Sequence, residues 1–204
     1  MLKSKIIDNR GLIIFIKNPV LGKVKTRLAK TIGNEKALQV YKNLMAHTQQ
    51  VAIDTETSRY LFYDTEIAHN DEWQQTHFIK GLQASGDLGD RIGAAFQTVF
   101  SKKEKVIIIG SDCPEISSDI IEEAFDKLDL ADVVIGPTHD GGYYLIGMKA
   151  YHASLFEDIA WSTEQVLTQT KEKITQQGLL FTLLKQLSDL DYEEDLNKFP
   201  AFSA

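Results

Sequence analysis

A hydrophobic run that ends in a carboxylate is the first candidate for chemistry in this chain. Residues 105–109 place four β-branched residues after a lysine, a composition typical of a strand buried on both faces. Asp112 follows, ahead of Pro114, which cannot continue a strand ladder. In open parallel α/β sheets, ligands bind beyond the carboxyl ends of the strands. A carboxylate at that place is suited to hold Mg²⁺ or Mn²⁺ for a phosphate-bearing substrate, because both ions favour oxygen ligands.

Asp112 also has a structural alternative, since an aspartate after a strand often caps the next helix. Three residues closer to that helix, Ser117, Ser118 and Asp119, already supply caps. Asp112 lies too far upstream to be needed for capping, and we keep both roles open at this point.

A basic loop over residues 17–27 follows the first buried strand and contains three lysines, an arginine and a glycine. At the carboxyl end of a strand, Lys25, Arg27 and exposed backbone N–H groups would form a phosphate cradle, with arginine adding bidentate contacts. The spacing matches neither a Gly-x-Gly-x-x-Gly turn nor a P-loop. The alternative is a solvated basic loop without a ligand.

Asp140, Gly141 and Gly142 form a second candidate group after another buried strand. The glycines permit a positive φ or close approach of the backbone to a ligand. Asp140 would act as a general base for an acceptor hydroxyl if it lay within about 3 Å of that group. A simple turn between two strands explains the Gly-Gly pair equally well.

An acidic segment, residues 189–195, holds five carboxylates in seven positions. Asp191 and Glu194 have the spacing of a capping box at a helix N-terminus, where acidic residues also complement the helix dipole. If this segment folds back beside Asp112, either acid could complete a cation site, because Mg²⁺ is bound by a few carboxylates together with phosphates and water.

A weaker candidate is the loop over residues 86–91. Gly86, Asp87 and Arg91 could contact an acceptor or a ribose. A glycine-bounded helix start explains the same residues nearly as well.

The elements that position these residues alternate between strands and helices. Strands are predicted at residues 11–17, 59–63, 77–80, 105–109, 132–137, 143–148 and 179–184, and helices at 34–53, 92–99, 119–128 and 163–177. Residues 18–31 are predicted as a polar loop, and Gly178 as a left-handed cap. This alternation indicates a mainly parallel sheet with helices on both faces, a three-layer α/β/α fold.

The bulk composition is that of a globular protein, with 43% hydrophobic and 25% charged residues. We expect one domain over residues 1–204, because no linker, repeat or low-complexity tract interrupts the chain. The net charge of −7 argues against non-specific nucleic-acid binding. One cysteine suits a reducing compartment, and no segment has membrane-spanning length. We therefore expect a cytoplasmic protein that binds neither nucleic acid nor membrane; the oligomeric state, a homodimer included, is left open.

Taken together, the motifs resemble the DUF2064 family, a group that includes glycosyltransferases. The resemblance covers nearly the whole chain and is carried by residues 15–28, 86–91, 110–114, 140–144, 161–163 and 189–196. It implies the GT-A, or nucleotide-diphospho-sugar transferase, fold. The same motifs are similar to those of the 2-phospholactate and molybdenum-cofactor guanylyltransferases.

The resemblance also implies roles for particular residues. Asp112 takes the place of the metal-binding acid after the central strand, and Asp191 and Glu194 match a late acidic motif that helps to hold the cation. The nucleotide-phosphate loop contains Lys17, Lys25 and Arg27.

One departure from the GT-A pattern bears on the reaction. Many GT-A glycosyltransferases carry Asp-x-Asp at this strand end, whereas this chain has Ser111, Asp112 and Cys113. The leading hypothesis is a metal-dependent transferase with a nucleotide-sugar donor and a small-molecule acceptor, using Mg²⁺ or Mn²⁺. The alternatives are a nucleotidyltransferase that uses a nucleoside triphosphate and a phosphorylated acceptor, and a catalytically silent nucleotide-binding protein.

Overall fold

The computed structural model describes residues 9–203 as one mixed sheet with helices around it. The strands are β1 (Arg10–Ile16), β2 (Ser58–Tyr63), β3 (Ile79–Leu82), β4 (Lys105–Ile109), β5 (Val133–Pro137), β6 (Tyr143–Met148) and β7 (Phe181–Leu183). The α-helices are α2 (Thr26–Ile32), α3 (Asn34–Asp54), α4 (Leu88–Phe100), α5 (Ser118–Lys127), α6 (Val166–Gln176) and α7 (Glu193–Lys198). Two 3₁₀ turns, η1 (Ala153–Leu155) and η2 (Pro200–Phe202), complete the described elements.

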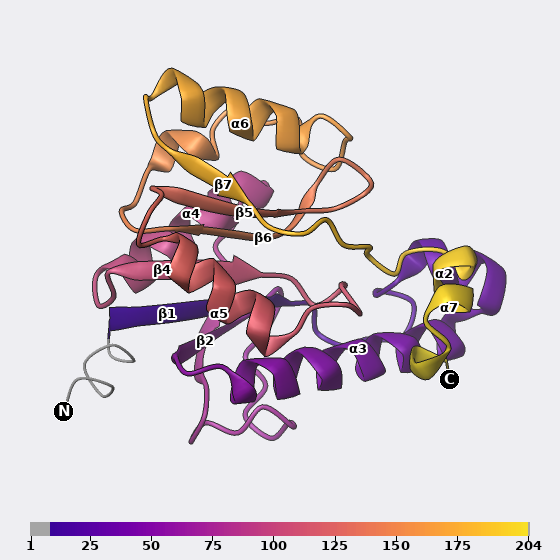
Figure 1. Cartoon of the computed structure of the whole chain (residues 1–204). Coiled ribbons are helices and arrows are strands. Elements are labelled where there is room, and N and C mark those ends of the chain that lie inside the picture. The colour runs from indigo at the N-terminus through magenta and orange to yellow at the C-terminus, as the bar shows by residue number, and fades with distance from the viewer. Residues whose placement is uncertain (1–8, 204) are drawn as a thin grey trace.

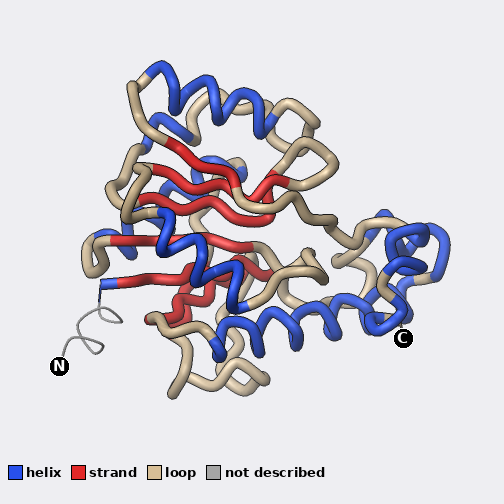
Figure 2. Tube along the Cα trace, viewed as in Figure 1, coloured by secondary structure: helices blue, strands red, loops and turns tan. Residues whose placement is uncertain are grey.

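The sheet has the strand order β3-β2-β1-β4-β6-β5-β7. Every neighbouring pair is parallel except the two pairs that involve β6, which runs antiparallel to β4 and β5. The carboxyl ends of β1, β4 and β5 therefore lie at one edge of the sheet, which we call the C-terminal edge. The predicted mainly parallel α/β sheet is confirmed, and Figure 2 shows its strands between the helices.

Helices cover both faces of the sheet, as predicted. On one face, α3 and α5 pack on the sheet through residues that include Val51, Ile121 and Phe125. On the other face, α4 and α6 pack through residues that include Phe96 and Ile174. In Figure 1, α3 and α5 lie in front of or below the strands, and α4 lies behind them. Burial of two apolar faces on a sheet is what makes a three-layer architecture stable.

A small third hydrophobic cluster lies beyond the C-terminal edge. There Leu28 of α2 and Leu44 of α3 pack with Leu190, and part of α7 closes over them. Figure 1 shows α2 and α7 side by side at the N-terminal end of α3. This packing brings the first basic segment of the chain next to its acidic segment.

The prediction of a loop over residues 18–31 was wrong in its second half, where α2 begins at Thr26. Leu28 is buried, and Ala29 and Ile32 pack against the same cluster. Gly33 ends the helix with φ +85°, a conformation that glycine adopts without strain. The apolar residues of α2 are too few to give a clear helical period among lysines and threonines, so only the tertiary contacts decide the structure.

The other predicted elements are present with shifted ends, such as β3 at Ile79–Leu82 and a shorter β7 at Phe181–Leu183. Gly178, two residues after the end of α6, has φ +67°, in agreement with the predicted left-handed cap. Within residues 9–203, no helix is long and apolar enough to cross a membrane. The expectation of one domain over residues 1–204 stays a prediction, and residues 1–8 and 204 lie outside the described part.

Candidate active site

Three connections meet at the C-terminal edge, and one later segment crosses them. The edge carries the loop after β1, the loop after β4 and the turn between β5 and β6. The segment after β7 runs across them, because Leu187 N–H donates to Pro137 O and Leu190 N–H donates to Asp112 O at 2.9 Å. Residues near positions 25, 112, 140 and 190 are thereby brought together, as Figure 1 shows for the crossing segment.

Lys25 is the central cation of this arrangement. It precedes α2 with φ +45°, and its side chain is only 3% exposed. Its ammonium lies 2.6 Å from the Leu190 carbonyl oxygen, 2.7 Å from Asp112 Oδ1 and 3.3 Å from Asp191 Oδ1. Burial lowers the pKa of Lys25, but the charges of Asp112 and Asp191 outweigh it and raise the pKa above its ordinary value.

The three acceptors match the three N–H donors of the Lys25 ammonium. A direct contact between Lys25 and a phosphate would therefore require the release of one present partner. In this structure Lys25 links the loop after β1 to Asp112 and Asp191.

Arg27 lies on the solvent side of the same cluster. Its guanidinium donates to Asp191 Oδ2 at 3.0 Å and lies 5.8 Å from the Tyr192 ring. About half of its side chain is exposed, so several of its donors still face water. Arg27 is thus held at the edge with donors available for an anionic ligand.

Asp112 lies where the sequence placed it, just beyond β4, with its side chain about half exposed. Ser111 before it is buried, and its hydroxyl lies 3.3 Å from the Tyr41 hydroxyl. Ser117 caps α5 by accepting from Ile120 N–H. The capping alternative for Asp112 is therefore removed, and its carboxylate faces the edge.

Asp189 is the acidic residue of this edge that the sequence did not single out. It lies on the crossing segment between buried Leu187 and Leu190. Burial, and then the charges of Asp112 and Asp140, raise the pKa of Asp189 to about 7. A carboxyl group whose pKa is strongly raised by burial and by neighbouring charges is a candidate for a functional site. A signal existed, because Asp189 lies between the apolar residues Leu187 and Leu190, but the four carboxylates that follow it masked it.

The segment over residues 138–142 is a tight turn between antiparallel strands, in agreement with the turn alternative. Asp140 Oδ1 accepts from the Thr138 hydroxyl and from Gly142 N–H. Gly141 has φ +87°, and a Cβ there would lie 2.2 Å from the backbone oxygen of Glu164. The turn is thus fixed against the start of α6, and Asp140 keeps its second carboxylate oxygen for a ligand.

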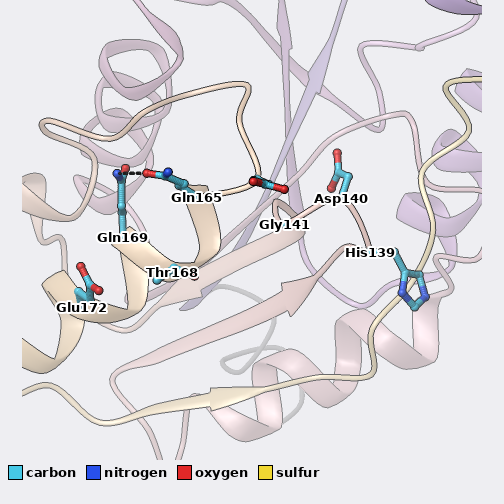
Figure 3. Close-up of a pocket in the computed structure, with 8 residues that line it drawn as sticks. His139, Asp140, Gly141, Gln165, Thr168, Gln169 and Glu172 are labelled. Atoms are coloured by element: carbon cyan, nitrogen blue, oxygen red, sulfur yellow. Dashed lines mark hydrogen bonds between the residues drawn. The ribbon is translucent and has the colours of Figure 1, made fainter.

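A hollow of about 690 Å³ adjoins this turn. It lies between the β5–β6 turn and the exposed side of α6, and the residues that define its chemistry are Asp140, Gly141, Glu164, Gln165, Thr168 and Glu172. Figure 3 shows Asp140 on one side and the glutamines of α6 on the other. The charge of Asp140 also helps to raise the pKa of Asp189, so the hollow adjoins the acidic edge.

The remaining predicted residues have structural roles or exposed side chains. Asp87 and Asp90 form a capping box at the start of α4, and Arg91 Nε donates to the Gly86 carbonyl oxygen. The helix-start alternative for that loop is therefore present in the structure. Lys17 has an exposed side chain, while its backbone N–H and C=O both bond to the Tyr41 hydroxyl.

The predicted capping box of Asp191 and Glu194 was wrong by one residue. Asp195 Oδ2 accepts from the N–H groups of Asp191 and Tyr192. Glu194 is exposed on α7, and within residues 9–203 its side chain forms no hydrogen bond or ion pair. The reason is that Asp191 turns its carboxylate toward Lys25 and Arg27, where two cations stabilise it more than a backbone N–H would.

The described carboxylates do not complete a metal site on their own. Across residues 9–203, no three Asp, Glu, His or Cys side chains lie close enough to hold an ion. Asp112 and Asp189 nevertheless offer hard oxygen donors at an edge with excess negative charge, as the raised pKa of Asp189 shows. This donor set fits Mg²⁺ or Mn²⁺ when substrate phosphates and water supply the other ligands.

The sheet order and the acidic edge define the class of the protein: it has the nucleotide-diphospho-sugar transferase fold. A crystal structure of a protein proposed to be such a transferase, from Desulfovibrio desulfuricans G20, is similar with a TM-score of 0.88. The two are 30% identical, and the match covers 94% of this chain and 86% of that one. Residues 46–163, more than half of the chain, also match the family described as "Uncharacterized protein conserved in bacteria (DUF2064)". The chain belongs to the DUF2064 family.

More distant relatives include nucleotidyltransferases. The 2-phospho-L-lactate guanylyltransferase of Methanocaldococcus vulcanius is 24% identical over 145 residues, which span 68% of this chain and 62% of that protein. The 4-diphosphocytidyl-2C-methyl-D-erythritol synthase of Anaerococcus prevotii has a TM-score of 0.62 at 12% identity, over 97% of this chain and 98% of that one. At this identity the second match shows the fold alone.

One neighbour of the same fold was crystallised with manganese. It is Rv0371c of Mycobacterium tuberculosis, with a TM-score of 0.50 and 10% identity over 93% of this chain and 96% of that one. The similar proteins thus include one proposed to be a nucleotide-diphospho-sugar transferase and others named as nucleotidyltransferases.

Proposed function

We propose that this chain is a metal-dependent nucleotidyltransferase that acts on a nucleoside triphosphate and a small phosphorylated acceptor. The observation that carries the proposal is the convergence of Asp112 and Asp189 next to the cations Lys25 and Arg27. The kinship with a guanylyltransferase supports the same reaction.

In the proposed reaction, a phosphate oxygen of the acceptor attacks the α-phosphorus of the triphosphate. A new P–O bond forms to the acceptor, and the bond between the α-phosphorus and its bridging oxygen breaks. The electron pair leaves with pyrophosphate. Because the attacking phosphate is already anionic, no side chain has to remove a proton from it.

Asp112 and Asp189 would hold the divalent cation together with phosphate oxygens of the nucleotide. When bound, the cation offsets negative charge on the reacting phosphates and on the leaving pyrophosphate. Arg27 would contact phosphate oxygens with the donors it keeps toward solvent. Lys25 would hold Asp112 and the crossing segment in place, so that both acids meet the ligand in a fixed geometry.

Asp140 would orient the acceptor. Its Oδ1 is used by the turn, and its second oxygen faces the adjoining hollow and would accept a hydrogen bond from an acceptor hydroxyl. If the acceptor instead reacts through a hydroxyl, the same oxygen is the candidate general base.

A second candidate function is glycosyl transfer from a nucleotide sugar, which the similarity to the Desulfovibrio protein favours. Asp112 and Asp189 would then bind the diphosphate of the donor, and a nucleoside diphosphate would leave. The same residues serve both reactions, so the products distinguish them.

The test combines ligand binding with product analysis. The melting temperature is measured with GTP, CTP and nucleotide sugars, with and without Mn²⁺, followed by assays for pyrophosphate and nucleoside diphosphate. Asp112→Asn should remove the Mn²⁺-dependent shift, whereas the exposed α5 control Asp126→Asn should keep it. Pyrophosphate release supports nucleotidyl transfer, and a nucleoside diphosphate released from a sugar donor supports the second candidate. Nucleotide binding that survives Asp112→Asn, without turnover, would instead indicate a silent binding protein.

A further inference from the structure

The hollow between the β5–β6 turn and α6 is a built feature of the fold. Leu167 N–H donates to the Gly141 carbonyl oxygen at 2.9 Å, which fastens the turn to the first turn of α6. Gly141 permits this contact because any Cβ would meet the backbone of Glu164. Both walls of the hollow therefore keep a fixed distance from each other.

Hydrogen bonds between side chains also fix the amide groups on the α6 side of the hollow. Gln169 accepts from Ala160 N–H through Oε1 at 2.7 Å and donates through Nε2 to Gln165 Oε1 at 3.2 Å. Figure 3 shows this pair of amides along the helix. The amide NH₂ of Gln165 remains as a donor toward the hollow, next to the hydroxyl of Thr168.

Apart from His139, the ionisable residues that line the hollow are all acidic. Asp140, Glu164 and Glu172 contribute three carboxylates, and the lining contains no lysine or arginine. Glu164 and Glu172 form no ion pair in the described part of the chain. Each carboxylate repels an anionic ligand group at about 7 Å by an energy close to RT in a water-like dielectric, or about threefold in affinity.

We propose that this hollow binds the uncharged, hydroxyl-rich body of the acceptor, with its phosphate directed to the Lys25 and Arg27 side of the edge. The term acceptor rests on the proposed function, whereas the charge preference rests on the lining. Hydroxyl groups both donate to carboxylates and accept from the Gln165 amide and Thr168 hydroxyl. An ammonium ion would use the carboxylates alone and leave these donors without a partner.

The test follows the side-chain amide signals of Gln165 and Gln169 by ¹H–¹⁵N NMR. The probes are D-glucose, D-glucuronate, which replaces one CH₂OH by a carboxylate, and D-glucosamine, which adds an ammonium. D-glucose should shift both signals with a millimolar dissociation constant. D-glucuronate should bind at least about threefold more weakly.

The Glu172→Lys variant should narrow the preference for D-glucose over D-glucuronate by about ninefold, because one repelling carboxylate is replaced by an attracting ammonium at about threefold for each charge. Gln176→Lys adds a lysine at the end of α6, outside the lining, and should leave the preference unchanged. Preference for D-glucuronate in the unsubstituted protein would overturn the proposal, and so would a preference for D-glucosamine well above the roughly 30-fold that three carboxylates supply by charge alone. So would unshifted signals with D-glucose at about 100 mM, a concentration that detects even weak millimolar binding.

The outcome is separable from that of the proposed function. Loss of sugar binding while Mn²⁺-dependent nucleotide binding persists overturns only the assignment of the hollow. Sugar binding that persists in a protein without nucleotide binding overturns the proposed nucleotidyl transfer and keeps the hollow as a polyol site.

Discussion

Replacing Asp189 by asparagine should make the protein more stable at neutral and alkaline pH, and only there. Asp189 has a pKa raised from 3.8 to about 7 by burial and by neighbouring Asp112 and Asp140. Between these two values the folded chain binds more protons at this residue than the unfolded chain does. The contribution of Asp189 to the free energy of unfolding is therefore fully present below about pH 4 and is lost as pH rises through about 7.

The magnitude follows from the size of the shift. About three pKa units correspond to roughly 4 kcal/mol at 1.36 kcal/mol for each unit. Because the Asp189 side chain is only partly buried, water screens part of this cost, and we expect about half, roughly 2 kcal/mol. Asparagine keeps the shape and carries no charge, so the variant avoids this cost.

The assay is urea unfolding of both proteins from pH 4 to 8.5. The difference in unfolding free energy should be near zero at pH 4 and reach about 2 kcal/mol in favour of Asp189→Asn above pH 7.5. Mn²⁺ with a nucleotide should stabilise the unsubstituted protein and leave the variant nearly unchanged. The control Asp126→Asn should show neither effect. A difference that is flat with pH, or that favours the unsubstituted protein at pH 8, would refute the proposed convergence of acids.

Three further predictions concern stability and reactivity. Lys25→Met should destabilise the fold by about 2 kcal/mol in urea, because it leaves Asp112 without its cation and the Leu190 carbonyl without its donor, whereas Lys23→Met at an exposed position should not. Gly141→Ala should cost more than about 2 kcal/mol of unfolding free energy, since its Cβ would meet a backbone oxygen. Gly178→Ala, also at positive φ but with open space around it, should cost only about 1 kcal/mol; equal losses would contradict the crowding argument. Cys113, whose pKa burial raises to about 12, should react with a thiol reagent only after unfolding, and rapid labelling of the native protein would disprove its burial.

The sheet could be predicted because the amino-acid composition of its central strands is typical of buried strands. The β-branched runs of β1 and β4 and the run of β5 are buried on both faces, and such runs have few alternatives to a central strand. The antiparallel direction of β6 was not predicted, since strand direction depends on connection length and packing. The short helix α2 was also not predicted, because its burial depends on Leu44 and Leu190, which are distant in sequence.

The candidate site could be predicted in its parts and only partly in its geometry. Asp112 was found because it ends a buried strand, and Asp140 because two glycines follow it. The choice of Asp191 and Glu194 as cation ligands stays untested, while Asp189 was missed. Which acid of residues 189–195 faces inward is decided by the hydrogen bonds of Leu187 and Leu190 to the sheet edge, and no local pattern encodes those bonds.

The bond between Lys25 and the Leu190 carbonyl joins residues 165 positions apart. A growing polypeptide can form most of β1, β2 and β4 early, yet the charged edge stays open until the segment after β7 has been made. Closing so long a loop carries an entropic cost that the sheet must already offset. A molecule clipped before residue 187 would thus keep the sheet strands and lack the closed charged edge.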